Sequence, residues 1–440
     1  MQSEQGTFAG KRICALGLGR FGGQLAAIEY LLKQGAQLRV TDTANPDTLV
    51  ESIESLSQYP GIKFEFGPQT DETVKNCDAL LVSPAIRPRH PCILAAKKDG
   101  LPLLTEIGLF LNACRGQVLA ISGTVGKSTT AAMLARILQA AGKKTYLGGN
   151  IGNSLLPIVE QIQSKDFVVL ELSSFQLDYL RQNQPAFTAA VLTNLVPHHL
   201  EWHGSAQAYR EAKAVMFQGQ NSTQLSVLPE SHRHESWPGI AERVNYRIDD
   251  LNGEFLDWPA HDQHNAAAAM SVARWLGIEQ SVIFEALHNY SGLPHRLEKI
   301  PNSLHRTVIN DSKSTSPIAT LAAIDVICAP TWIIIGGADS LDDPTPLLSR
   351  LIHHENIQGI AWMGPAGKRL AGIFAQQNTE ATQTVSENLS SVWQWCWENS
   401  QRDHTILMSP GYPSFNEFLN YEVRGEQLIT LVRETEGKTD

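Results

Sequence analysis

The chain has 440 residues, of which 42% are hydrophobic and 18% are charged, with a formal net charge of −10. This balance is typical of a globular protein with several cores, and the length suits two to four domains. The negative charge argues against a nucleic acid as the main ligand, because phosphate backbones are held largely by clustered Lys and Arg.

The elements expected along the chain alternate between apolar strands and amphipathic helices, which is typical of parallel α/β layers. Residues 12–16 predict a strand and residues 17–22 a glycine turn, and a helix follows to about Gln34. Residues 127–141 have helical spacing of their apolar side chains. Further strands are expected at 38–42, 78–83, 117–122, 167–171, 187–193, 332–335, 360–363 and 405–409. The polar stretch 221–252 predicts an irregular surface excursion.

This order of elements predicts three α/β domains. They are a Rossmann-like domain over 1–104, a central P-loop-type ATPase domain with a parallel sheet over 105–292, and a Rossmann-like domain over 293–440. No apolar run approaches a membrane span, and the N-terminus lacks the apolar region of a secretory signal. The 6 cysteines show no CxxC spacing, which favours reduced thiols. We therefore expect a cytoplasmic, monomeric protein.

The first glycine turn carries Gly17, Gly19 and Gly22, with Asp42 about twenty residues further on. This pattern matches a dinucleotide fingerprint. It suits NAD, but it suits the diphosphate and ribose of another nucleotide equally well. Nothing later in the chain indicates hydride chemistry.

A second glycine-rich segment, residues 122–129, lies between an apolar strand and an amphipathic helix. Its glycines let successive N–H groups face phosphate oxygens, and the helix N-terminus adds positive potential. Lys127 would neutralise the β- and γ-phosphates, and a hydroxyl would help to hold Mg²⁺. An ordinary glycine turn is the alternative. The residues expected to bind ATP here are Gly123, Thr124, Val125, Gly126, Lys127, Ser128 and Thr129.

Two polar groups follow later strands of the central block. Glu171 ends a strand, where a carboxylate can bind Mg²⁺ or can simply be solvated or cap a helix. His198, His199 and His203 follow the next strand, but their spacing lacks the partners of a specific zinc site. A histidine that faces Mg²⁺ or the substrate is the preferred interpretation.

Taken together, these segments resemble the Mur ligases of peptidoglycan synthesis. The motifs occur in the family's order and cover essentially the whole chain. They are GTVGKSTT from Gly123, GGNIGN from Gly148, ELSSFQL from Glu171, NLVPHHLEWHGSAQAYREAK ending at Lys213, HNAAAA from His264, GLPHRLE from Gly292, NDSKSTSP from Asn310 and SPGYPSFNEFLNYEVRG from Ser409.

The resemblance implies an ATP- and Mg²⁺-dependent amide-bond ligase. Its substrates would be UDP-linked muramoyl-alanine and an acceptor amino acid, D-glutamate in the most similar members. The chain would activate the substrate carboxylate as an acyl phosphate, which the amine then attacks. The third domain would swing on a hinge near 292–296 to exclude water during this reaction.

The resemblance also implies a role for each matching residue. The catalytic residues would be Lys127, Lys213, His199 and Arg296, and the metal ligands Ser128, Glu171, His199 and Lys213 if it is carbamylated. The UDP substrate would contact Arg20, Phe21, Asp42, Thr43, Ser83, Asn150, Ser173, Gln176 and His199. The nucleotide would also contact Asn265, Arg296, Asp311 and Lys313, and the acceptor amino acid Thr315, Ser414, Phe415 and Tyr421.

Three positions depart from the family's pattern. Val125 replaces a polar residue near ATP, and Ala268 replaces an Asn that follows His264. Ser340 stands where the family carries a Lys that pairs with an acceptor carboxylate. Loss of such a contact weakens binding by about 1.5–3 kcal/mol unless another cation compensates.

Several alternatives follow from these departures and from the first glycine turn. The enzyme could use a different acceptor, or the chain could be a nucleotide-binding regulatory protein that has lost ligase activity. A nicotinamide dehydrogenase would rest on the first fingerprint alone. A folylpolyglutamate-type ligase shares the ATP chemistry but fits HHLEWHGS and SPGYPSF less well.

Overall fold

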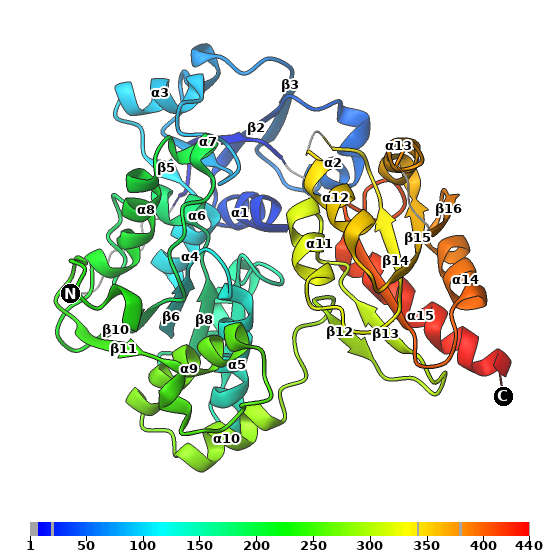
Figure 1. The fold of residues 1–440 in the computed structure, drawn as a ribbon. Coiled ribbons are helices and arrows are strands. Elements are labelled where there is room, and N and C mark those ends of the chain that lie inside the picture. The colour runs from blue at the N-terminus through cyan, green and yellow to red at the C-terminus, as the bar shows by residue number, and fades with distance from the viewer. Residues whose placement is uncertain (1–7, 19–21, 341–342, 378–380, 440) are drawn as a thin grey trace. The chain divides into compact units, whose positions relative to one another are not determined.

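The computed structural model describes residues 8–18, 22–340, 343–377 and 381–439. The chain divides into two compact units, Met1–Tyr290 and Ser291–Asp440. The first unit contains two parallel sheets and the second unit contains a third sheet (Figure 1). The predicted α/β class is therefore confirmed. The domain boundaries at 104 and 292 remain predictions.

The first sheet has the strand order β3-β2-β1-β4-β5, and all of its strands are parallel. Its strands are β1 Arg12–Leu16, β2 Gln37–Asp42, β3 Ile62–Phe66, β4 Ala79–Val82 and β5 Leu103–Leu104, and its helices are α1 Gly22–Lys33, α2 Val50–Ser57, α3 Pro91–Lys98 and α4 Glu106–Ala113. Alternate residues of β1 belong to two different buried clusters. Because both faces are covered, the strand is a continuous apolar run rather than an alternating one.

The second sheet has the order β11-β10-β9-β6-β8-β7 and is also parallel throughout. Its strands are β6 Gln117–Ser122, β7 Thr145–Gly149, β8 Phe167–Glu171, β9 Ala189–Leu192, β10 Leu225–Pro229 and β11 Glu242–Tyr246. Its helices are α5 Lys127–Ala140, α6 Ser174–Tyr179, α7 Leu200–His203, α8 Ala206–Gln218, α9 Ala260–Trp275 and α10 Gln280–His288. Helix α5 packs against α9 and α10 through the apolar face that its spacing predicted (Figure 1).

The prediction of an irregular excursion over 221–252 was wrong. This segment supplies β10 and β11, which continue the parallel sheet beyond β9. The β10 run is only five residues long, and β11 leaves most of its side chains partly or fully exposed. Ser226 interrupts the short apolar run of β10, although all of its residues are buried, and β11 has no apolar run. β10 pairs with β9, which is distant in sequence, and β11 pairs with β10.

The sheet of the second unit has the order β12-β13-β17-β14-β15-β16, with β12 antiparallel to β13 and the other pairs parallel. Its strands are β12 Glu298–Ile300, β13 Thr307–Asn310, β14 Thr331–Gly336, β15 Ile357–Met363, β16 Thr382–Ser386 and β17 Thr405–Gly411. Its helices are α11 Pro317–Ile324, α12 Thr345–His353, α13 Gly364–Phe374, α14 Leu389–Asn399 and α15 Tyr421–Thr439. Alternate residues of β14 and β17 enter two separate cores, so this sheet is also covered on both faces.

Among the helices of the described ranges, none combines the length and the apolar character that crossing a lipid bilayer requires.

Candidate functional site

The glycine-rich segment 122–129 forms a tight loop between β6 and α5, hereafter the phosphate loop. Gly126 has φ +80° and precedes the first turn of α5. A β-carbon at Gly126 would collide with Asn265 Oδ1, and one at Gly123 would collide with Thr193 Oγ1. Glycine is therefore required at both places. The loop aims the N–H groups at the start of α5 outward, where a helix N-terminus can bind an anion.

The shape of the phosphate loop is set by residues that follow β9. The backbone N–H groups of Thr124 and Val125 both donate to Asn194 Oδ1, at 3.1 and 3.0 Å. Asn194 Nδ2 and Thr193 Oγ1 donate in turn to the Val125 carbonyl, at 3.0 and 2.6 Å. Asn194 opens the NLVPHH motif, but its spacing alone did not assign it this role. The Thr124 and Val125 amides are therefore already engaged, and the amides nearer the helix are the ones that could bind an anion.

Lys213 lies beneath the phosphate loop, in α8. Its side chain is 1% exposed, and Nζ donates to the Gly123 carbonyl at 2.7 Å and to Ser122 Oγ at 3.3 Å. Nζ also lies 4.8 Å from the centroid of the Tyr209 ring. Burial and then the nearby Lys127 ammonium hold the pKa of Lys213 well below its usual range, and Glu171 opposes them in part. The site therefore favours a neutral amine, which is the form that can react with CO₂.

Glu171, at the end of β8, is 1% exposed. Its Oε1 accepts a hydrogen bond from Asn150 Nδ2 at 2.8 Å, whereas its buried Oε2 has no partner among the described residues. A buried carboxylate oxygen without a donor is costly unless a cation binds it. Ser128 is also buried, on the first turn of α5. A carboxylate and a hydroxyl beside a phosphate loop fit Mg²⁺, which typically takes one or two carboxylates together with phosphate oxygens.

Lys127 and Asn265 complete the described surroundings of the phosphate loop. Lys127 Nζ donates to the Thr124 carbonyl at 2.8 Å. Asn265 Oδ1 accepts from Thr130 Oγ1 at 3.2 Å, so α9 is held against the start of α5. The structure thus brings Lys127, Ser128, Glu171, Lys213 and Asn265 together, as the sequence predicted for a single site.

The histidines after β9 lie in an aromatic cluster. His199 has φ +53° and precedes α7, and its ring centroid lies 4.8 Å from that of Phe175 and 3.9 Å from that of His198. His203 Nε2 lies 2.9 Å from Ser174 Oγ. Burial lowers the pKa of both His199 and His203, which favours neutral rings. Within the described ranges no group of three His, Cys, Asp or Glu is arranged to bind a metal, so the zinc interpretation gains no support.

Two predicted substrate contacts, Ser173 and Gln176, form the start of α6. Ser173 Oγ accepts from the Gln176 N–H at 3.2 Å, and the Ser173 N–H donates to Gln176 Oε1 at 2.9 Å. This reciprocal pair is a capping box. At the other end of α6, Tyr179 Oη donates to the Ile86 carbonyl at 2.6 Å. Helix α6 therefore joins the central sheet to a turn of the first sheet.

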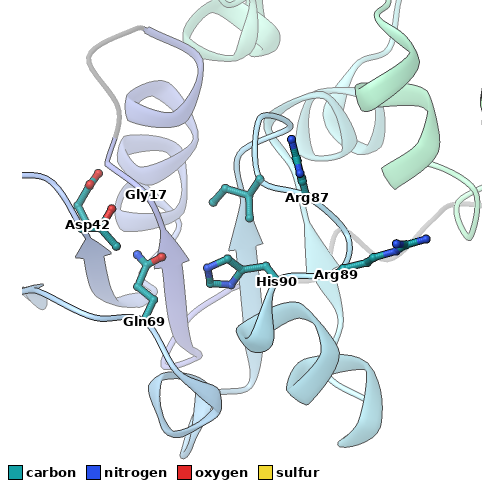
Figure 2. A pocket seen from close by; sticks show the side chains of 8 residues that line it. Gly17, Asp42, Gln69, Arg87, Arg89 and His90 are labelled. Carbon is teal, nitrogen blue, oxygen red and sulfur yellow. The ribbon is translucent and has the colours of Figure 1, made fainter. Parts of the chain in front are cut away.

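That turn borders a cavity of about 480 Å³ at the carboxyl ends of β1 and β2 (Figure 2). The cavity is lined by Gly17, Asp42, Thr43, Gln69, Ile86, Arg87, Arg89 and His90. Asp42 and Thr43 are where the sequence placed them. Ser83 is not among the lining residues, although its carbonyl accepts the Ile86 N–H at 3.0 Å within the same turn. The predicted contacts Arg20 and Phe21 lie outside the described residues.

The two sides of the cavity differ in polarity. Asp42 accepts from the Leu18 and Ala44 N–H groups, both at 2.8 Å, and lies on one side with Gln69 (Figure 2). Arg87, Arg89 and His90 come from the segment between β4 and α3 on the other side, and neither arginine has an acidic partner among the described residues. An unpaired cationic side suits phosphate groups.

Sequence reasoning missed Arg87, Arg89 and His90, although they follow the Ser83–Ile86 turn directly. Arg89 Nη2 lies 3.4 Å from the position that a β-carbon on Gly204 would occupy. Gly204 ends α7, the helix that His199 precedes. The cationic side of the cavity therefore extends toward the histidine cluster of the central sheet.

In the second unit, the predicted nucleotide contacts lie at the carboxyl ends of β13 and β17. Asp311 is 3% exposed and accepts from Ser314 Oγ at 2.5 Å and Ser409 Oγ at 2.6 Å. Burial raises its pKa, and Arg296 is among the groups that oppose the rise. Lys313 Nζ lies 5.8 Å from the centroid of the Tyr421 ring.

A buried arginine that the sequence did not single out holds this edge together. Arg424 is fully buried and donates to Ser312 Oγ, to the Ser312 carbonyl and to the Tyr412 carbonyl, at 3.0, 2.9 and 3.0 Å. It therefore ties the loop after β13 to the loop after β17. The predicted acceptor contacts Ser414 and Phe415 follow Tyr412, with Ser414 buried and Phe415 44% exposed.

The structure also places the three departures from the family pattern. Val125 is 64% exposed, so its side chain leaves the phosphate loop unobstructed. Ala268 is fully buried in the core between α5 and α9, where it is a packing position. Ser340 lies beside a cation, because Arg369 Nη2 donates to the Ser340 carbonyl at 3.4 Å and to Asp339 Oδ1 at 2.8 Å.

The sequence of the chain is similar to the sequences of known Mur ligases. A sequence model of the Mur ligase MurD-like N-terminal domain matches residues 11–105, and one of the Mur ligase middle domain matches residues 121–250. The UDP-N-acetylmuramoylalanine–D-glutamate ligase of Zymomonas mobilis is 34% identical, with 97% of this chain and 98% of the relative covered. The ligase of the same name from Novosphingobium aromaticivorans is 33% identical, with 97% and 95% covered.

Two solved structures share the fold at low sequence identity. The UDP-N-acetylmuramate-alanine ligase MurC of Thermotoga maritima has a TM-score of 0.59 at 17% identity and covers 97% of this chain and 100% of its own. MurF of Thermotoga maritima, solved in complex with ADP, has a TM-score of 0.55 at 15% identity, with 98% and 96% covered.

Proposed function

Because the chain belongs to the Mur ligase family, we propose that it joins D-glutamate to UDP-N-acetylmuramoylalanine while ATP is converted to ADP and phosphate. Members of this family are ATP-dependent amide-bond ligases of peptidoglycan precursor synthesis, and this chain is an enzyme of that class. The observation that supports the site most strongly is the convergence of Lys127, the buried Lys213 amine and the unpartnered Glu171 oxygen at the phosphate loop.

In the first step, an oxygen of the substrate carboxylate attacks the γ-phosphorus of ATP, and the bond to the β-phosphate oxygen breaks to release ADP. The N–H groups at the start of α5 and the Lys127 ammonium stabilise the charge on the transferred group. A magnesium ion, held by Glu171, Ser128, His199 and a carbamylated Lys213, would neutralise the phosphate oxygens. A carbamate would turn the Lys213 position from a neutral amine into an anion, which the Lys127 ammonium would attract.

In the second step, the neutral amine of the amino acid attacks the acyl phosphate, and the tetrahedral intermediate expels phosphate to leave the amide. Water would hydrolyse the acyl phosphate, so it must be excluded. Arg296, Asp311 and Lys313 of the second unit would complete the nucleotide site when that unit closes on a hinge at 292–296. Scattering curves that do not change on addition of nucleotide and substrate would contradict the hinge.

The UDP part of the substrate would occupy the cavity of the first sheet. Asp42 and Gln69 present hydrogen-bonding groups suited to the nucleoside, and Arg87 and Arg89 present cations suited to the diphosphate. Arg89 lies beside Gly204 at the end of α7. The muramoyl-alanine end of the substrate would therefore extend from the cavity toward His199 and the phosphate loop.

The acceptor side chain would be held by Arg369 in place of the missing Lys at position 340. The Arg369 guanidinium touches the Ser340 segment and is anchored by two contacts of 2.8 and 3.0 Å to Asp339 Oδ1. An anchored arginine retains donors for a second carboxylate because its planar group carries five N–H groups. D-glutamate therefore remains the proposed acceptor, in agreement with the names of the relatives.

Phosphate release with UDP-N-acetylmuramoylalanine, ATP and magnesium, measured across D- and L-amino acids, tests the function. We expect turnover with D-glutamate at least tenfold above the other acceptors. Absence of ADP with every amine would remove the ligase proposal, and turnover with another amino acid alone would correct the acceptor.

The role of Arg369 needs a separate test. Arg369→Gln should raise the KM for D-glutamate by about tenfold, the cost of one charge-assisted contact, and leave the KM for the UDP substrate unchanged. Ser340→Lys in the Arg369→Gln background should restore part of the affinity. An unchanged KM for D-glutamate in Arg369→Gln would show that another group binds the carboxylate.

A further inference from the structure

Two cysteines of the first sheet lie against each other. Cys14 is fully buried in the middle of β1, and Cys77 precedes β4, the strand that pairs with β1. Cys77 is half-buried and packs on the cluster that contains Cys14. The pKa of each of the two thiols is shifted most by the other thiol. The two sulfurs are thus neighbours, one enclosed by the core and the other within reach of solvent.

A guanidinium group faces this thiol pair. Arg39 lies in β2, directly opposite Cys14 in the strand register, and its Nη2 is 3.1 Å from Cys77 Sγ. The same nitrogen donates to the Thr73 carbonyl and, at 3.0 Å, to the Lys75 carbonyl. These contacts hold the cation in place over Cys77. A cation beside a thiol stabilises the thiolate, which is the nucleophilic form.

The other charged groups around the pair do not cancel the effect of Arg39 on Cys77. Arg12 of β1 is paired with Asp78 at 3.1 Å, and Glu65 of β3 lies 3.8 Å from Arg39 Nε. Lys75 is paired with Glu72. The Cys14 thiol and the charge of Arg39 lower the pKa of Cys77, against the effect of its burial, whereas the Cys77 thiol and burial raise the pKa of Cys14. The pair therefore consists of a nucleophile and a protonated neighbour.

We propose that Cys77 and Cys14 form an oxidative modification site, in which Cys77 reacts with a peroxide and Cys14 resolves the product to a disulfide. The observations that carry it are the packing of Cys77 on the buried cluster that contains Cys14 and the Arg39 group held 3.1 Å from Cys77 Sγ. The proposal does not depend on the ligase function.

The chemistry balances with hydrogen peroxide as the oxidant. The Cys77 thiolate attacks one peroxide oxygen, the O–O bond breaks, and hydroxide leaves and takes up a proton to become water. Cys77 is then a sulfenic acid, oxidised by two electrons. The Cys14 sulfur attacks the Cys77 sulfur, the S–O bond breaks, and the hydroxyl group leaves with the Cys14 proton as a second water. A disulfide remains.

Two other cysteines serve as internal controls. Cys328 is exposed, and its sulfur lies 3.6 Å from the Val326 carbonyl. Cys92 belongs to the same buried cluster as Cys14, but its sulfur donates to the Thr70 carbonyl at 3.1 Å instead of facing a cation. Burial raises the pKa of Cys92. Cys328 thus tests whether exposure alone makes a cysteine reactive. Cys92 tests whether closeness to Cys14 alone is enough.

The first measurement is the pH profile of alkylation. The full-length enzyme is treated with iodoacetamide between pH 5 and 9, and each cysteine is followed by peptide mass spectrometry. The midpoint for Cys77 should lie at least about one pH unit below that for Cys328. Arg39→Gln should move the Cys77 midpoint upward, and Arg39→Lys should move it less. Equal midpoints for Cys77 and Cys328 in the parent would overturn the proposal.

The second measurement identifies the oxidised product. Hydrogen peroxide should link Cys14 to Cys77 in the parent, with reversal by dithiothreitol, and should leave Cys92 and Cys328 unlinked. Cys77→Ser should abolish the link, and Cys14→Ser should leave a Cys77 sulfenic acid that dimedone traps. Ligase turnover of both reduced variants should match the parent, which confirms folding. A parent that accumulates Cys77 sulfenic acid without the Cys14 link, or links Cys77 to Cys92, would contradict the assignment.

Discussion

The two glycine turns of the first unit begin alike and end with different surroundings. Each follows the central strand of a parallel sheet, β1 or β6, and each leads into a helix, α1 or α5. Around the second turn the structure gathers Lys127, Lys213 and Glu171. Beside the first turn the cations come instead from the distant segment that carries Arg87 and Arg89. The same order of strand and helix therefore acquires its chemistry from the segments that follow neighbouring strands.

The neighbouring strands differ in what they place at the edge. The strand β2 ends at Asp42, whose two oxygens accept backbone N–H groups of the first turn and its surroundings. The strands β8 and β9 end near Glu171, which keeps a free buried oxygen, and Asn194, which braces the phosphate loop. These arrangements support the proposal that one edge binds a nucleoside diphosphate and the other binds a cation and a transferable phosphate.

The largest expected effect belongs to the second turn. Lys127→Ala should lower kcat/KM by about 10³-fold, because a cation on the transferred phosphoryl group is lost. ADP release measures this effect. Lys143→Ala, which removes an exposed lysine beyond the C-terminal end of α5, is the matched control and should behave as the parent. Activity of Lys127→Ala above a tenth of the parent would show that the second turn does not depend on the Lys127 cation.

Lys213→Ala should lower turnover by about 10²-fold, since a ligand that organises the phosphate oxygens disappears. If a carbamate is the active form, acetate or formate should restore part of the activity in this variant and none in Lys127→Ala. Full activity of Lys213→Ala, without added carboxylate, would show that the buried amine has only a structural role.

A smaller effect is expected at the first turn. Arg87→Ala and Arg89→Ala should each raise the KM for the UDP substrate by about 3- to 10-fold, because exposed charged contacts contribute about 1 kcal/mol. The kcat and the KM for ATP should stay unchanged. Arg115→Ala, an exposed arginine outside the cavity, is the control. A change in the KM for ATP instead would place these arginines in the nucleotide site.

The smallest effect concerns Glu106, a buried residue at the start of α4. It accepts from Ser154 Oγ, and burial raises its pKa to about 7. The folded chain therefore holds a proton that the unfolded chain releases near pH 4.5, so this contribution to stability is present below pH 4.5 and is lost as pH rises through 7. Glu106→Gln, which stays neutral, should raise the Tm by a few degrees at pH 8 and change it little at pH 5.

Thermal unfolding at both pH values checks that prediction. Glu285→Gln, at an exposed position on α10, should leave the Tm unchanged at either pH. If Glu106→Gln lowers the Tm equally at pH 5 and pH 8, the Glu106 carboxylate is needed in its charged form and the assigned direction is wrong.

Much of the fold and part of the site followed from local patterns. The β6 strand, the glycines and α5 are consecutive, so their spacing alone predicted the phosphate loop. Strands β10 and β11 were missed because Ser226 interrupts the short apolar run of β10 and because most of β11 is exposed or half-buried, so only their pairing in the sheet reveals them. Arg369 could not be related to Ser340, since 29 positions separate them and only the packing of α13 brings them together.

The sequence by itself determined the α/β alternation, the places in the phosphate loop where glycine must stand and the family to which the chain belongs, because each of these depends on neighbours along the chain. Only the tertiary structure decided the neutral state favoured for Lys213, the bracing role of Asn194 and the packing of Cys77 on the buried cluster that contains Cys14. Those properties depend on burial and on charges from other strands. Parallel sheets supply both by bringing the ends of distant segments to one edge.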